Sequence, residues 1–125
     1  MVKDAVDKVK EFHSKAEYPI NTTLDIDTIR QEKELRKRLL VEEVSEYIHA
    51  EDDNDIIEIA DSLADMIYII CGTAITYGIP LDKVFDEVHR SNMTKFKHGV
   101  IRREDGKILK PDDYEPPKLK EIIYE

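Results

Sequence analysis

Acidic residues repeat at helical spacing in two short segments of this chain: Glu42, Glu43 and Glu46 in the first, and Glu58, Asp61 and Asp65 in the second. At about 100° per residue, each set lies on one side of a helix. Crowded carboxylates repel one another unless a cation neutralises them. Oxygen ligands on rigid helices suit hard cations such as Mg²⁺ or Mn²⁺, which often bind substrate phosphates as well. The pattern therefore predicts a metal site that supports phosphoryl chemistry.

A spare carboxylate beside such a metal could accept a proton from the attacking water. The chemistry would then need no Ser, Cys or His nucleophile. Asp65 has no settled part in this scheme, because it could equally cap a helix or pair with a lysine. The plain alternative for both sets is a solvated acidic surface.

Four helices must position these side chains. Apolar periodicity and end signals place them at about residues 2–16, 28–50, 55–77 and 80–94. Thr28 followed by Gln31 resembles a capping box at the start of the second helix. Gly78 and Pro80 predict the end of the third helix and the start of the fourth. The fold class is therefore all-α, a helical bundle in which the second and third helices form an acidic antiparallel hairpin.

The hairpin is expected to close through two apolar faces, so that its acidic stripes face each other beside the seam. These faces consist of Leu40, Val44, Tyr47 and Ile48 on one helix, and Ile59, Leu63, Met66, Ile67 and Ile70 on the other.

After the helical core, at about residues 2–95, the sequence predicts an irregular tail over residues 96–125, rich in Gly and Pro. Asp105 and Gly106 lie between two short apolar pairs, which is a hairpin signal. Such a tail could act as a lid or as a strap across a neighbouring subunit. A length of 125 residues without an earlier linker fits a single domain.

Residues 89–95, at the end of the fourth helix, bring several hydrogen-bond donors together. In so acidic a chain these could hold phosphates or a sugar, with Lys95 as a point charge. The alternative is structural, because Arg90 and Lys95 also favour a helix C-terminus through the helix dipole.

The composition limits the possible partners. A net charge of −9 argues against a nucleic-acid polymer. The uncharged run at residues 66–81 is too short and too interrupted to span a membrane comfortably, so no membrane partner is expected. One cysteine, Cys71, and no signal-peptide pattern favour the cytoplasm.

Residues 38–46 and 58–68 resemble the all-α nucleoside triphosphate pyrophosphohydrolase superfamily, which includes MazG, the dimeric dUTPases and the phosphoribosyl-ATP pyrophosphohydrolases. Residues 84–95 and 105–111 look like its MazG-like subgroup. The resemblance covers about residues 30–117. It implies an all-α bundle, a homodimer or homotetramer, and Mg²⁺-dependent cleavage between the α and β phosphates of a nucleoside triphosphate.

The resemblance also implies roles for single residues. The family signature, E-x-x-E followed by E-x-x-D, makes these metal ligands: Glu43, Glu46, Glu58 and Asp61. Glu42 would be a further ligand or the base that activates water, and Asn92 and Lys95 would contact sugar and phosphates. Some alignments put the last aspartate at Asp65, which would leave Ser62 in the glutamate position.

The substrate expected from the tail and from residues 89–95 is a dNTP or dUTP, removed as nucleotide clean-up, with phosphoribosyl-ATP of histidine biosynthesis as the alternative. The chain has no Trp, so any base stacking must use Tyr, Phe or His. Two other classes stay open. One is a ferritin-like di-metal protein, because Glu46 and His49 fit its E-x-x-H pattern. The other is a non-catalytic helical interaction module.

Overall fold

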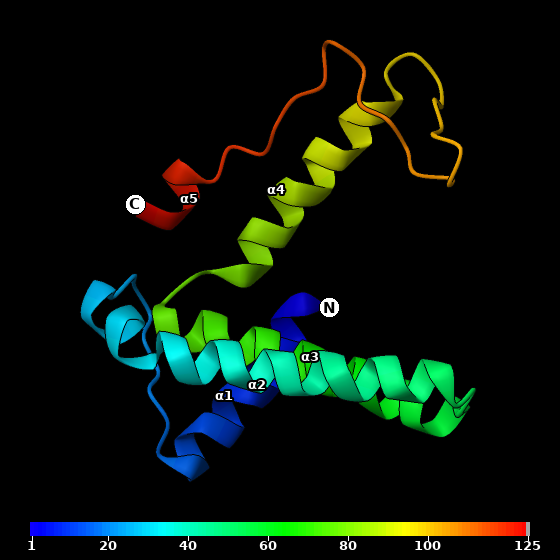
Figure 1. Ribbon diagram of the computed structural model, residues 1–125. Helices are drawn as coiled ribbons and strands as arrows, with labels where there is room; N and C mark the ends of the chain where they lie inside the picture. The colour runs from blue at the N-terminus through cyan, green and yellow to red at the C-terminus, as the bar shows by residue number, and fades with distance from the viewer. Residues whose placement is uncertain (125) are drawn as a thin grey trace. The chain divides into compact units, whose positions relative to one another are not determined.

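The computed structural model describes residues 1–124, and its architecture confirms the all-α prediction with four main helices. They are α1 (Val2–Ala16), α2 (Ile26–Asp52), α3 (Ile56–Tyr77) and α4 (Leu81–Met93), followed by a 3₁₀ turn at Thr94–Phe96 and the short α5 (Lys120–Tyr124) (Figure 1). Over residues 1–124 no strand is present. The chain divides into two compact units, Met1–Leu81 and Asp82–Glu125, which are described separately. A single domain over residues 1–125 stays a prediction.

In the first unit, α2 and α3 lie side by side as an antiparallel hairpin (Figure 1). Asp25 caps α2 by accepting a hydrogen bond from the backbone N–H of Thr28, so the helix begins two residues earlier than expected. The predicted capping box at Thr28 is therefore wrong. Asp55 caps α3 in the same way, and Gly78 ends it in the left-handed conformation, as predicted.

Helix α1 packs against α3. Val9 of α1 meets Cys71 and Ile75 of α3 in the core of this unit, and Ala5 and Val6 pack against them. Burial raises the pKa of the Cys71 thiol, which suits a core side chain better than a nucleophile.

The seam of the hairpin differs from the sequence-based expectation. Of the predicted contact residues, five large side chains are at least 37% exposed instead of covered: Val44, Ile48, Leu63, Ile67 and Ile70. The seam instead holds the buried Arg36, which donates hydrogen bonds to the Ile69 carbonyl and the Thr73 hydroxyl at 3.0 Å. Burial lowers the pKa of this guanidinium. These five apolar side chains therefore lie on faces of the hairpin that remain exposed in the first unit.

By length and composition alone, α3 could cross a membrane, and a third of its most apolar window is buried within the structure. The same helix packs against α1 and α2 and carries Asp61 and Asp65. These contacts and charges tie α3 to the first unit, while the absence of a membrane partner stays a prediction.

In the second unit, the tail is tied to α4 by buried polar contacts. The Ser91 hydroxyl lies 2.8 Å from the Tyr114 hydroxyl and 2.7 Å from the Glu115 carbonyl, and the Glu115 N–H donates to the Thr94 hydroxyl. The predicted hairpin is present as one antiparallel bridge between Arg102 and Ile108. The tail therefore acts as a strap along its own α4.

Candidate metal and substrate site

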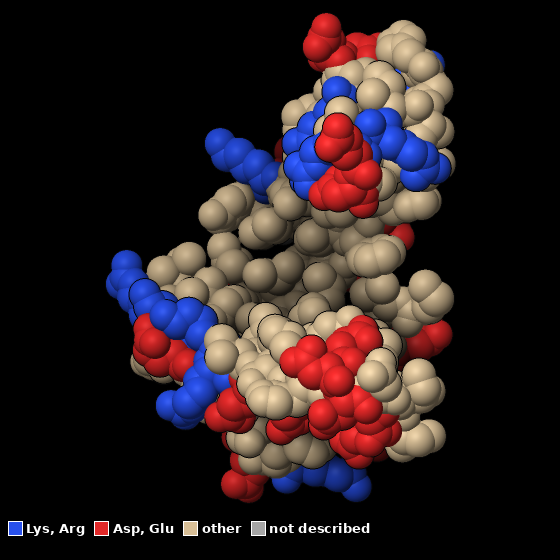
Figure 2. Space-filling view, turned by 45° about the vertical axis from the view of Figure 1, so that its right-hand side comes forward, with Lys and Arg blue, Asp and Glu red and all other residues tan. Residues whose placement is uncertain are grey.

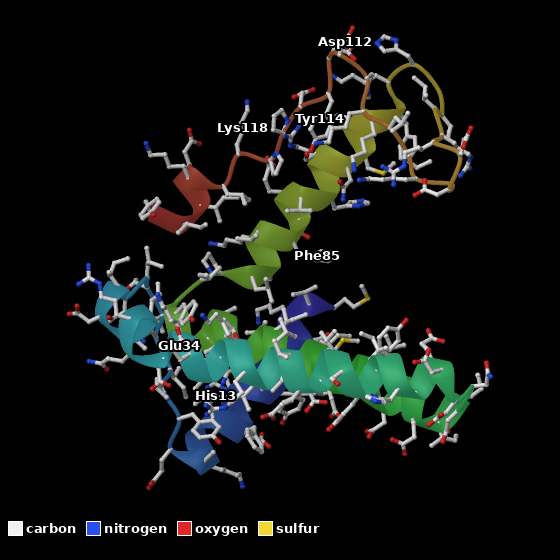
Figure 3. All side chains as sticks on the ribbon, in the orientation of Figure 1. His13, Glu34, Phe85, Asp112, Tyr114 and Lys118 are labelled. Carbon is white, nitrogen blue, oxygen red and sulfur yellow. The ribbon has the colours of Figure 1, made fainter. Side chains whose placement is uncertain are left out.

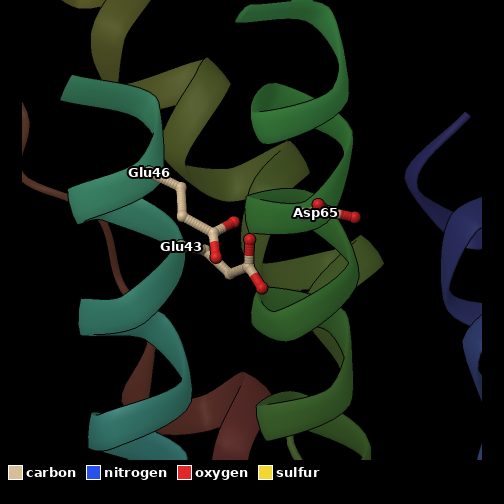
Figure 4. Close-up of side chains that lie close together, drawn as sticks. All are labelled: Glu43, Glu46 and Asp65. Carbon is tan, nitrogen blue, oxygen red and sulfur yellow. The ribbon is translucent and has the colours of Figure 1, made fainter. Parts of the chain in front are cut away.

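Three carboxylates converge across the α2–α3 hairpin. Glu43 and Glu46 come from α2 and Asp65 from α3, and one oxygen of each lies within 4.8 Å of the others (Figure 4). Glu43 and Asp65 are half-buried, while Glu46 is exposed. The expectation that the acidic stripes face each other is confirmed at these positions.

Glu43 is the most strongly perturbed member. Its pKa is raised from 4.5 to about 7, first by burial and then by the negative charges of Glu46, Asp65 and Asp61. Both causes disfavour a further negative charge at this position when no cation is near.

The donor set fits a hard divalent cation. One Glu43 oxygen, Oε2, is buried without a hydrogen-bond partner, so it is an acceptor that lacks a donor. Within residues 1–124, no lysine or arginine forms a salt bridge with any of the three carboxylates. Oxygen donors from two rigid helices suit Mg²⁺ or Mn²⁺. The cluster could therefore hold such an ion and gain stability from it.

The other predicted acids, Glu42, Glu58 and Asp61, are not among the three clustered carboxylates. Asp61 is close enough to Glu43 to raise its pKa. Glu58 lines an open pocket with Glu46 and His49 near the α2–α3 turn, and Figure 2 shows acidic side chains gathered over the hairpin. Glu42 is exposed. The ligand roles of Glu58 and Asp61, and either role of Glu42, stay predictions.

Asp65 is the residue whose place the sequence left open. The structure puts it in the three-carboxylate cluster, opposite Glu43 and Glu46. One feature of the sequence did point to Asp65: the alternative alignment in which Asp65 is the aspartate of the E-x-x-D motif and Ser62 occupies its glutamate position. Ser62 is buried and has no carboxylate to offer, so the α3 side of the cluster is Asp65 itself.

The E-x-x-H pattern has less support in this geometry. His49 directs Nδ1 at the carbonyl of Ser45, 3.0 Å away, as a donor within its own helix. The three-carboxylate cluster contains no histidine in the part of the chain that the structure describes.

In the second unit, several polar side chains of residues 89–95 contact the tail that forms the strap along α4. Arg90 pairs with Glu87 at 2.8 Å and with Glu115 at 3.3 Å. Its hydrogen bond is the main reason that the pKa of Glu87 is lowered to about 2, with the Lys118 backbone N–H adding to it. Figure 3 shows the labelled Tyr114 and Lys118 on the strap beside α4. These contacts support the structural reading of Arg90.

Asn92 and Lys95 differ from Arg90. Asn92 is exposed, and the Lys95 ammonium lies 6.0 Å from the centre of the Tyr114 ring. Lys110 approaches the same ring at 5.0 Å, a contact that sequence reasoning missed because it depends on how the strap folds back. Substrate binding by Asn92 and Lys95 stays a prediction.

The comparisons with known proteins agree with the resemblance. A family model described as phosphoribosyl-ATP pyrophosphohydrolase matches residues 9–92, more than half of the chain. An uncharacterized protein, L479 of Acanthamoeba polyphaga mimivirus, is 35% identical over 77 residues. That match covers 59% of this chain but only 31% of the viral protein, so the chain spans about a third of the relative's length.

Proposed function

Because the chain belongs to the phosphoribosyl-ATP pyrophosphohydrolase family, within the MazG-like all-α superfamily, we propose that it hydrolyses a nucleotide between its α and β phosphates. The products would be a nucleoside monophosphate and pyrophosphate. The observation that carries this proposal is the cluster of Glu43, Glu46 and Asp65, with its orphaned buried oxygen and raised pKa.

The cluster would hold Mg²⁺, or Mn²⁺ in its place, with Asp61 and Glu58 as further ligands on α3. When bound, such an ion neutralises charge on phosphoryl oxygens and helps to orient the leaving group. The rigid hairpin holds the facing carboxylates in place before the ion arrives. Glu43 must be deprotonated to bind the ion, so its raised pKa implies that binding releases protons and strengthens as pH rises.

Glu42 is the proposed general base. Its exposed carboxylate lies next to Glu43 in the chain and is free to accept a proton from the attacking water. The water oxygen then bonds to the α phosphorus. The bond from this phosphorus to the oxygen that bridges the α and β phosphates breaks, and pyrophosphate leaves with the electron pair of that bond. In the second unit, Asn92 and Lys95 are the proposed contacts for sugar and phosphates.

For the substrate, we favour a dNTP or dUTP, because residues 89–95 and the tail look like the MazG-like subgroup. The second candidate is phosphoribosyl-ATP, which the description of the matching family names. Both offer a polyphosphate to the same carboxylates, so the groups that recognise base and sugar must decide between them.

The exposed apolar side chains of the hairpin support a homo-oligomer. Leu40, Val41, Val44 and Ile48 line an apolar groove on α2, and Val41 is 66% exposed. An open apolar surface of this kind commonly marks a protein interface. A second copy of the chain is the proposed occupant, in a homodimer or homotetramer that works in the cytoplasm.

The test is a screen for pyrophosphate release across dNTPs, rNTPs and phosphoribosyl-ATP with Mg²⁺ or Mn²⁺. Glu46→Gln should abolish turnover while the circular dichroism spectrum stays unchanged. The matched control is Glu34→Gln, an exposed acid on the same helix that pairs with Lys37 at 3.0 Å. Full activity of Glu46→Gln, or equal loss in both variants, would contradict the assignment.

A further inference from the structure

Three aromatic side chains form an exposed cluster on the first unit, which we name the aromatic platform: Phe12 of α1, Tyr18 of the following turn and Tyr68 of α3. Phe12 packs edge-on against Tyr68, with ring centres 5.4 Å apart, and against Tyr18 at 6.2 Å. All three side chains remain substantially exposed, at 48%, 45% and 39% in the order Phe12, Tyr18, Tyr68. Large aromatic rings usually bury themselves, so an exposed contiguous set suggests a ligand surface.

Buried contacts hold the three elements of the aromatic platform together. His13, next to Phe12, is buried and lies 5.4 Å from the Tyr18 ring; it is labelled in Figure 3. Its Nδ1 donates to the carbonyl of Pro19 at 3.0 Å, which ties the turn to α1. The core of Val9, Cys71 and Ile75 holds α1 against α3. The rings are therefore held in place before any ligand arrives.

The position of the platform on α3 connects it with the carboxylate cluster. Tyr68 follows Asp65 by three residues, which places them on neighbouring positions of one helix surface, about 4.5 Å apart along its axis. Both belong to the first unit, so their separation is set by the helix itself. In a nucleotide, one sugar joins the phosphates to an aromatic base. The carboxylate cluster, with its metal ion, could bind the phosphates while the neighbouring aromatic platform binds the base.

We infer that the aromatic platform binds the base of the nucleotide substrate. Because the planes of Phe12 and Tyr68 are 86° apart, the base would stack on the face of one ring and contact the other ring edge-on. This inference rests on the proposed pyrophosphohydrolase function. Stacking of a base on an aromatic side chain changes affinity by roughly 5- to 150-fold. Within residues 1–124 the hydroxyls of Tyr18 and Tyr68 make no hydrogen bond, which leaves them available to the polar edge of a base. A hydroxyl placed in this way is also a group that could select between bases.

The test uses nucleosides, which carry a base but no phosphate, with the 125-residue protein in EDTA. Aromatic resonances of Phe12, Tyr18 and Tyr68 are followed by NMR while adenosine, deoxyuridine and the other nucleosides are added, with ribose as the baseless control. Shifts with nucleosides but not with ribose are expected. Tyr68→Leu and Phe12→Leu should each weaken binding by roughly 5- to 150-fold. Tyr68→Phe should keep the stacking, and Tyr124→Leu, outside the platform, should change nothing.

Three results would overturn the inference. The first is the absence of aromatic shifts with every nucleoside. The second is equal nucleoside affinity in the wild type, Tyr68→Leu and Phe12→Leu. The third is a change of the platform resonances with protein concentration and none with nucleoside, because the occupant would then be a second copy of the chain.

Turnover assays separate this inference from the proposed function. If a nucleotide is hydrolysed, Tyr68→Leu should raise KM and leave kcat unchanged, and an unchanged KM refutes base binding while hydrolysis stands. If no nucleotide is hydrolysed but nucleosides shift the platform resonances in EDTA, the proposed reaction fails and the base site is retained.

Discussion

Replacing Gly72 with alanine should destabilise the protein, although alanine is the better helix former. A Cβ at position 72 would lie 2.5 Å from Nη2 of Arg36 and 3.0 Å from Nε2 of His13. Arg36 is buried and cannot retreat without giving up its hydrogen bonds to Ile69 and Thr73. Gly72 is therefore the residue that lets a guanidinium cross the seam of the hairpin.

The size of the effect follows from two opposing contributions. Losing one hydrogen bond from a charged donor costs about 1.5–3 kcal/mol. Alanine in place of glycine in a helix returns about 1 kcal/mol. The expected net loss is about 0.5–2 kcal/mol in the free energy of unfolding. Urea denaturation of Gly72→Ala and wild type, followed by circular dichroism, measures this difference.

The double variant isolates the cause. In an Arg36→Ala background the clash with the guanidinium is gone and only the 3.0 Å approach to Nε2 of His13 remains. Gly72→Ala should then cost less than in the wild type and could stabilise the protein by up to about 1 kcal/mol. Wild-type stability of Gly72→Ala alone, or an equal cost of Gly72→Ala with and without Arg36, would contradict a clash with the guanidinium.

Three further predictions concern other parts of the chain. In EDTA, the raised pKa of Glu43 means that the folded state holds a proton that the unfolded state releases, so stability should fall as pH rises from about 4.5 to about 7. The full pKa change corresponds to about 3 kcal/mol, and solvent screening reduces it to about 1–2 kcal/mol; urea titrations should show this slope in wild type and lose it in Glu43→Gln. Gly78→Ala should cost several kcal/mol, because φ is +78° and the new Cβ would collide with the backbone carbonyl of Thr23. A melting temperature equal to wild type would disprove it. Ser91→Ala should loosen the strap by removing the contacts to Tyr114 and Glu115, seen as faster amide hydrogen exchange over residues 111–118, and unchanged exchange there would argue against it.

The helices were largely predictable from the sequence because their signals are local. Apolar spacing marked their extents, and Gly78 gave the end of α3 because only a left-handed residue closes the helix there. The start of α2 was misplaced because Asp25 and Thr28 both offer a capping oxygen, and only the backbone conformation at Asp25 decides between them.

The covered faces were less predictable. Periodicity shows that Val44, Ile48 and Ile67 share faces with other apolar residues, but not what lies against those faces. Arg36 gave no sign of burial, because its place depends on Gly72 one helix away. Asp65 joined the candidate site for a similar reason, since the rotation of α3 against α2 decides which acids meet. The reaction class was predicted from the family resemblance. The structure shows which of the predicted acids lie close together, namely Glu43, Glu46 and Asp65.

The most direct test of the carboxylate site is Mn²⁺ binding measured by electron paramagnetic resonance on the purified 125-residue protein. Wild type should bind Mn²⁺, Mg²⁺ should compete for the site, and Asp65→Asn and Glu43→Gln should each lose most of the binding while Glu34→Gln keeps it. If wild type binds no Mn²⁺, or if Asp65→Asn binds it as tightly as wild type, the metal site assigned to Glu43, Glu46 and Asp65 is contradicted.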